Sequence, residues 1–179
     1  MVAMAAATPA MGGLAPPARN GIRYVVTDKR ISASLAFAAW LENGGTQSLE
    51  VTEGLTTLWS EVLVPHWRSS GDAVAGLTSI GVWDALSQQA QQQFRRARIL
   101  GTHCVDPSGR AKGHALEQDE AGTAAALAEG LEHKDWPLAL ALNAEACRQL
   151  APTQASFCRI GNTQRHSADT RHFVSWIIE

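Results

Sequence analysis

The chain has 179 residues, of which 45% are hydrophobic and 18% charged, a balance typical of one globular domain rather than of disordered or fibrous proteins. Its formal net charge of −2, without a clustered basic face, argues against a nucleic-acid partner. No apolar run approaches the roughly 20 residues that cross a bilayer, so we expect a soluble protein that does not span a membrane.

The first twenty residues are rich in Ala, Gly, Pro and Met and carry no charge before Arg19. They show no periodicity, so we expect a flexible N-terminal tail over 1–20 and a single α/β domain over 21–179. The tail also resembles the small-residue end of an export signal. A periplasmic or otherwise exported protein and a cytoplasmic one are therefore the two alternatives.

Four short apolar runs follow at intervals of about 25 residues, a spacing typical of strands that alternate with helices. Such strands are parallel and are joined by right-handed crossovers, with helices on the faces of the sheet. The runs begin near Ile22 (IRYVVT), Leu49 (LEVT), Ala73 (AVAGL) and Arg98 (RILGTHCV).

The first two intervals between these runs carry helical patterns. In the first, Ser32 is a candidate N-cap and the pair Gly44-Gly45 a stop signal. In the second, five apolar residues follow one helix face, and Pro65 is expected to end or bend that helix. The five are Leu55, Leu58, Trp59, Val62 and Leu63.

In the third interval, Thr78 or Ser79 is expected to cap a helix that runs to about Ala97. Its polar face is rich in Gln and its predicted buried face is apolar. The residues of that face are Val82, Trp83, Leu86, Ala90 and Phe94.

The rest of the chain is expected to contain a surface loop from Asp106 to Gln118, helices over 123–131 and 135–150, and a C-terminal β-hairpin. The hairpin strands are Ala155–Ile160 and His172–Ile178. The predicted fold is therefore α/β: a three-layer, doubly wound, mainly parallel sheet of about six strands with an antiparallel hairpin at one edge.

Several segments together resemble a group of small proteobacterial proteins that usually carry twin-arginine export signals. The resemblance spans most of 24–178 and depends on VVTDKRISASLAFAAWLENGG, GLTTLWSEVLVPHW, AVAGLTSIGVWDAL and FVSWII. It implies an export route and assigns no activity, cofactor or catalytic residue.

Ligands of open parallel sheets bind beyond the carboxyl ends of the strands, where the strand order reverses. For an order of 2-1-3-4 this crevice lies between the first and third strands. The residues that follow the four strands are Asp28 and Lys29, Thr52 and Glu53, Gly76 to Ser79, and Thr102 to Cys104. From these we take Asp28, Lys29, Thr78 and Ser79 as the candidate ligand-binding residues.

Thr78 and Ser79 would place hydroxyl groups and free amides at a helix N-terminus, which favours an anion, although simple helix capping explains them better. The candidate catalytic residues are Asp28, His103 and Cys104, because a thiolate beside an imidazole is a recognised nucleophile. Neighbours on a strand point to opposite faces, however, so His103 and Cys104 meet only where the strand has ended.

No metal site or cofactor is predicted. Phosphate-binding loops, GxGxxG, CxxC, GxSxG and HEXXH patterns are absent from the sequence. His166, Asp169 and His172 have the residue types of a metal site, but solvated loop residues explain them better. Of the three cysteines, Cys147 and Cys158 can pair in an oxidising compartment, which leaves Cys104 free.

Two hypotheses of function follow. The first is an exported protein that binds a small anionic or aromatic molecule, or that serves as an accessory subunit of a larger cell-envelope enzyme. The second is a cofactor-independent isomerase, lyase or hydrolase that uses Asp28, Thr78, His103 and Cys104 at the carboxyl ends of the strands. Convergence of these side chains on an open pocket would favour the enzyme.

Overall fold

The computed structural model of the chain describes residues 21–51, 54–108, 110–118, 135–141, 156–160 and 171–179. Their strands form one open sheet in the order β2-β1-β3-β7-β4-β5-β6. The strands are β1 (Ile22–Thr27), β2 (Gln47–Glu50), β3 (Ala73–Ser79), β4 (Ala97–Val105), β5 (Ala111–Gln118), β6 (Ser156–Ile160) and β7 (Arg171–Ile178).

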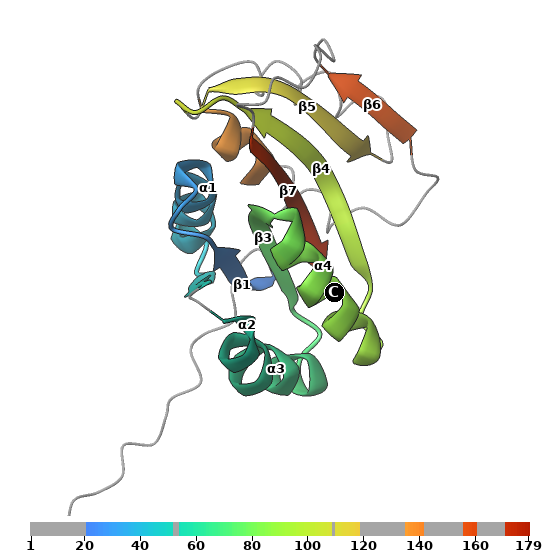
Figure 1. Cartoon of the computed structure of the whole chain (residues 1–179). Coiled ribbons are helices and arrows are strands. Elements are labelled where there is room, and N and C mark those ends of the chain that lie inside the picture. Colours follow the sequence, from blue (N-terminus) through green and yellow to red (C-terminus); the bar gives the residue numbers. More distant parts are fainter. Residues whose placement is uncertain (1–20, 52–53, 109, 119–134, 142–155, 161–170) are drawn as a thin grey trace, which may run out of the picture.

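The sheet is mixed. It is parallel across β2-β1-β3 and antiparallel at every pairing from β3 to β6. The predicted α/β class is confirmed, and all four predicted βα strands are present. The prediction of a mainly parallel sheet is wrong, because β7 runs in the opposite direction between β3 and β4, and β5 and β6 continue the antiparallel part (Figure 1).

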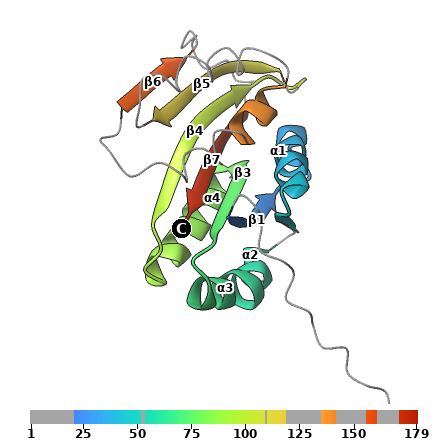
Figure 2. The ribbon, with the colours of Figure 1, turned by 180° about the vertical axis from the view of Figure 1, so that it is seen from behind.

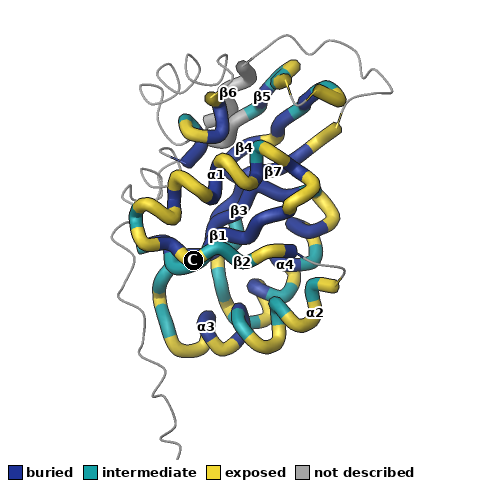
Figure 3. The backbone as a smooth tube through the Cα atoms, turned by 90° about the vertical axis from the view of Figure 1, so that its left-hand side faces the viewer, coloured by how far each residue is buried: buried dark blue, intermediate teal, exposed yellow. Residues whose placement is uncertain are grey.

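The C-terminal strand β7 lies at the centre of the sheet, so the predicted edge hairpin is also wrong. Every residue from Phe173 to Ile178 is buried. A run that is apolar on both faces belongs between two neighbours rather than at an edge. β7 pairs with β3 on one side and β4 on the other, whereas β6 pairs with β5. Figure 3 shows β7 as a largely buried stretch of the backbone near β3 and β4.

The predicted loop from Asp106 to Gln118 is mostly strand. Only a short turn joins β4 to β5, and Asp106 organises it by accepting hydrogen bonds from the backbone N–H groups of Ser108 and Arg110, both at 3.0 Å. Such Asx geometry closes a tight turn. The polar composition of β5 suggested a loop, whereas the segment is a strand near the edge of the sheet.

Helices pack on both faces of the sheet (Figures 1 and 2). Along β3, Ala73, Ala75 and Leu77 join the core beneath α1 (Ser32–Asn43) and the helical segment 136–141. Val74 joins the opposite core beneath the other helices. Those helices are α2 (Leu55–Thr57), η1 (Leu58–Leu63), α3 (Val64–Ser69) and α4 (Ile80–Gln92).

Pro65 does not end its helix. The backbone continues through α2, η1 and α3, and η1 is a π-helical stretch that ends two residues before the proline. A wider π turn relieves the clash between the proline ring and the preceding carbonyl groups and tolerates the missing N–H. The predicted apolar face is present, with Leu63 buried and Leu55, Leu58 and Trp59 packed against the core.

The predicted N-cap position of α4 is confirmed at Ser79, whereas α1 begins after Ile31 and not after the predicted Ser32. Ile31 and Ser79 occupy the N-cap positions of α1 and α4, and neither side chain makes a cap hydrogen bond. Ser34 instead accepts a hydrogen bond from the backbone N–H of Asp28 at 3.0 Å. α4 ends at Gln92 rather than near Ala97. None of the described helices is long and apolar enough to span a bilayer.

Gly76 makes room for the indole of Trp176, its register partner on β7. The indole Nε1–H donates to Thr78 Oγ1 at 2.9 Å, and the ring packs against Trp83 with centroids 5.8 Å apart. A Cβ atom at position 76 would overlap the six-membered ring of Trp176. The glycine therefore permits a tryptophan at the centre of the sheet.

Replacing Gly76 by alanine is expected to lower the free energy of unfolding by about 3 kcal/mol, because the new methyl group overpacks the core. Urea denaturation measures the change. Gly113→Ala on β5 is the matched control, since nothing lies within 4 Å of a Cβ atom there. The overpacking explanation fails when the two variants are equally stable.

α1 and α4 end in the same Schellman geometry with different residues. After α1, Gly45 has φ 92°, and the N–H of Thr46 donates to Leu41 O. After α4, Phe94 has φ 59°, and the N–H of Arg95 donates to Ala90 O. Glycine is the usual residue at this left-handed position, whereas Phe94 is strained there and is 98% exposed. The predicted burial of Phe94 is wrong.

Replacing Phe94 by asparagine is expected to raise the free energy of unfolding by about 1 kcal/mol, because asparagine tolerates the left-handed region and little packing is lost. Thermal denaturation gives the change. Phe94→Ala removes the same exposed ring but keeps the strained backbone, so it should bring no gain. Equal stabilisation by both variants would show that exposure rather than backbone strain is responsible.

Candidate functional site

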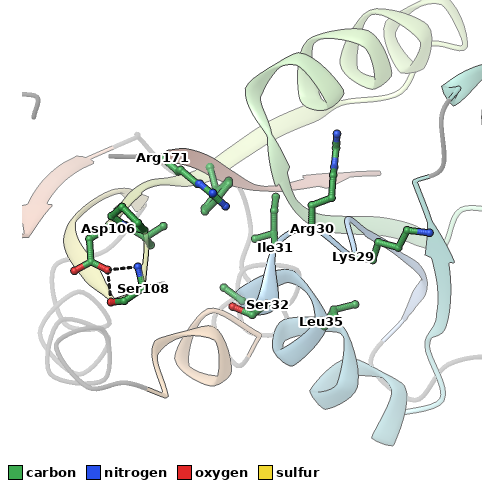
Figure 4. Close-up of a pocket in the computed structure, with 12 residues that line it drawn as sticks. Lys29, Arg30, Ile31, Ser32, Leu35, Asp106, Ser108 and Arg171 are labelled. Carbon is green, nitrogen blue, oxygen red and sulfur yellow. Dashed lines mark hydrogen bonds between the residues drawn. The ribbon is translucent and has the colours of Figure 1, made fainter. Parts of the chain in front are cut away.

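A pocket of about 300 Å³ opens at the carboxyl edge of the parallel strands (Figure 4). The chain after β1 and the start of α1 form one side, and the β4–β5 turn and the start of β7 form the other. The lining residues are Lys29, Arg30, Ile31, Ser32, Ala33, Leu35, Val105, Asp106, Pro107, Ser108, Arg171 and Phe173.

The direction of β7 determines the second side of this pocket. Because β7 is antiparallel to β3 and β4, its first residues lie where those strands end. Arg171 pairs with Val105, and Phe173 pairs with both Ser79 and His103. The hollow therefore lies at the carboxyl edge on the face covered by α1, and it extends from the chain after β1 to the β4–β5 turn without a lining residue from β3.

Two cations of the lining have carboxylate partners. The Arg30 guanidinium donates to both carboxylate oxygens of Asp28, at 2.8 and 2.7 Å. This bidentate pair holds the pKa of Asp28 below its usual value, although burial of the carboxylate opposes the shift. Lys29 Nζ lies 2.9 Å from Glu50 Oε1.

Asp106, the acidic residue of the lining, is also compensated. Its carboxylate accepts hydrogen bonds from the Ser108 hydroxyl and from two backbone N–H groups, and lies 3.2 Å from Lys112 Nζ. The bond from the Ser108 hydroxyl contributes most to lowering the pKa of Asp106 to about 2. This carboxylate therefore stays ionised and bound to the turn at neutral pH.

Arg171 differs from these groups. Among the described residues, its guanidinium has no hydrogen-bond or ion-pair partner, and the side chain extends from the start of β7 toward the hollow (Figure 4). The α1 N-terminus on the other side has no side-chain cap and no acidic residue in its first turn. Both features favour negative charge in the pocket.

The predicted ligand-binding residues do not all reach this pocket. Lys29 lines it, and Asp28 is buried beside it and holds Arg30. Thr78 is buried within β3, where its hydroxyl receives the Trp176 N–H, and Ser79 ends the same strand. The turn that was expected over Gly76 to Ser79 is strand. Thr52 and Glu53 lie outside the described residues.

The predicted catalytic residues are separated from one another. Thr102, His103 and Cys104 lie within β4, so His103 and Cys104 point to opposite faces. His103 is 1% exposed and Cys104 is half-buried. Asp28 follows β1, and β3 and β7 lie between β1 and β4. These side chains do not converge on one pocket.

A buried polar cluster joins three strands on the α1 face of the sheet, and sequence reasoning missed it. His103 Nδ1 lies 2.8 Å from His114 Nδ1, and His103 Nε2 lies 2.9 Å from Ser175 Oγ. Trp136 packs over both imidazoles, with ring centroids 5.1 and 5.0 Å away. The interpretation of β5 as a loop concealed that His114 pairs with His103.

In this cluster a serine hydroxyl, one imidazole and a second imidazole follow one another within hydrogen-bonding distance, an order that resembles a serine–histidine relay. The cluster consists of Ser175, His103 and His114, with Trp136 packed over the imidazoles. Ser175 is fully buried and His103 nearly so, so a substrate cannot reach the hydroxyl in this conformation. The cluster is therefore a structural network that connects β4, β5 and β7. Among the described residues, no group of three His, Cys, Asp or Glu side chains is placed to hold a metal ion.

Comparison with protein-family models, curated proteins and solved structures found no match to this chain. The relation to small exported proteins therefore stays a prediction. The same holds for the pairing of Cys147 with Cys158 and for the metal alternative of His166, Asp169 and His172, because the side chains of Cys147, Cys158, His166 and Asp169 lie outside the described part of the chain.

Lowering the pH below about 6.5 is expected to destabilise the protein. Burial, and secondarily the charge of His114, keep the pKa of His103 well below its usual value, and burial also lowers the pKa of His66. Below about pH 6.5 these two imidazoles bind protons in the unfolded chain but not in the folded one. Each of them therefore lowers the free energy of unfolding by up to about 1.4 kcal/mol for each pH unit of acidification. Urea denaturation across this range measures the loss.

The variant His103→Gln should be less stable at neutral pH and should lose less stability on acidification than the wild type. The wild type, measured over the same pH range, gives the comparison. An unchanged loss in His103→Gln would exclude His103 as its source.

Proposed function

We propose that the protein binds a small anionic ligand in the pocket between the start of α1 and the β4–β5 turn. The observation that carries the proposal is the Arg171 guanidinium, which has no partner among the described residues. Lys29, Arg30 and Asp106, the other charged residues of the lining, each have a counter-ion. An anion would supply the missing counter-charge and accept hydrogen bonds from the planar guanidinium.

The position of the pocket agrees with this proposal. If the sheet is treated as doubly wound around the β1/β3 junction, ligands are expected at its carboxyl edge, where this pocket lies. The hollow has the volume of a small-molecule site. The resemblance to small exported proteins adds the expectation that binding takes place in the cell envelope, where an accessory role to a larger enzyme would also operate.

The alternative of a cofactor-independent enzyme has less support. It requires Asp28, Thr78, His103 and Cys104 to share a crevice, and the strand order separates them. Thr78 and His103 are also buried in hydrogen bonds to Trp176 and Ser175. No observation in the described part of the chain favours catalysis over binding.

Titration with sodium acetate, followed by amide NMR shifts and compared with sodium chloride at equal ionic strength, tests the proposal. We expect acetate to shift the amides of Ser32, Ala33 and Ser108 in a saturable manner. Replacing Arg171 by glutamine should weaken binding by about tenfold or more, because a charge-assisted hydrogen bond contributes 1.5 kcal/mol or more.

Arg110→Gln is the matched control. Arg110 is exposed on the same β4–β5 turn, and its side chain is not part of the pocket lining. This variant removes the same charge and should bind acetate as the wild type does. Shifts no larger than those with chloride, or equal weakening in both variants, would contradict an anion site at Arg171.

A further inference from the structure

The pocket has a polar side and an apolar side. The apolar residues of the lining come from both walls of the pocket. Ile31 and Leu35 belong to the start of α1, and Val105, Pro107 and Phe173 belong to the β4–β5 turn and the adjoining ends of β4 and β7. A simple inorganic anion would satisfy Arg171 and leave the exposed part of this surface, Leu35 and Pro107, in contact with water, since Ile31, Val105 and Phe173 are already buried. A ligand that covers both sides has a charged group and an apolar group.

The charge balance restricts the ligand further. Three ion pairs, Lys29–Glu50, Arg30–Asp28 and Lys112–Asp106, compensate the other charges at the pocket. Arg171 is therefore the one charged residue of the described pocket lining that has no counter-ion. One positive charge matches a monoanion, and the planar guanidinium fork matches the two oxygens of a carboxylate.

The size of the pocket suits a small ligand. A volume of about 300 Å³ lies at the lower end of the range of small-molecule sites. It corresponds to roughly ten water molecules of liquid volume. A short-chain or single-ring acid fits this space.

We infer that the ligand is an amphipathic monocarboxylate, an acid with a short aliphatic chain or one aromatic ring. The carboxylate binds Arg171 near the α1 N-terminus, and the apolar group packs against Leu35 and Phe173. This inference depends on the proposed anion site and adds the chemical class of its ligand.

A series of acids tests the class on the full chain, with affinities from amide NMR shifts or calorimetry. The probes are acetate, butyrate, hexanoate and benzoate, with hexanamide as the uncharged partner and hexyl phosphate as a dianionic one. A methylene group withdrawn fully from water contributes about fourfold to affinity. Because the pocket is partly open, we expect hexanoate to bind at least about tenfold more tightly than acetate.

Leu35→Ser tests the apolar side, because Leu35 is 46% exposed and can be replaced without disturbing the core. We expect this variant to lose most of the gain in affinity from acetate to hexanoate, measured as the ratio of the two affinities in the same variant. Ala39→Ser, on the exposed face of the same helix, is the matched control and should retain the full gain.

The outcomes separate this inference from the proposed function. One outcome is acetate binding that is saturable and depends on Arg171, while the longer acids bind no more tightly than acetate. That result would overturn the amphipathic ligand and leave the anion site in place. Tighter binding of hexyl phosphate than of hexanoate would overturn the monoanion. Equal binding of hexanamide and hexanoate, or no saturable binding by any acid, would overturn both.

Discussion

The structure depends on β7, a C-terminal strand that enters the centre of the sheet against the direction of its neighbours. It makes hydrogen bonds to β3 and β4 on its two sides and contributes to both cores. Without it, β3 and β4 would have unpaired edges beneath the helices, where buried backbone groups are costly. Its reversed direction also brings Arg171 to the carboxyl edge, so the central strand is part of the candidate site.

The sequence predicted local structure more successfully than strand pairing. The segments that became β1 to β4, the helices between them and the stop after α1 all carry periodicity or glycine signals within a few residues. The partners of β5, β6 and β7 depend on contacts between residues far apart in the chain, such as Ala97 and Ile178. A hairpin was the simplest arrangement for two consecutive strands, but it would have exposed the apolar run of β7 at an edge.

The candidate site was predictable only in part, for the same reason. The rule that ligands bind at the carboxyl ends of parallel strands led to Lys29 and to Asp28, which holds Arg30. It could not lead to Arg171, because that residue precedes a strand whose direction the sequence does not reveal. The rule also favoured Thr78 and Ser79, yet Gly76 and Thr78 are required in the strand to accommodate Trp176.

The register of β7 connects the core to the site. Hydrophobicity alone specifies this register weakly, since the strand is apolar on both faces and a shift by two residues would keep each side chain on its face. Two contacts oppose such a shift: Trp176 fits only beside Gly76, and Ser175 lies within hydrogen-bonding distance of His103. A shift by two residues would move Arg171 by roughly 7 Å along the sheet. The interactions that hold Trp176 and Ser175 in place therefore also hold Arg171 at the pocket.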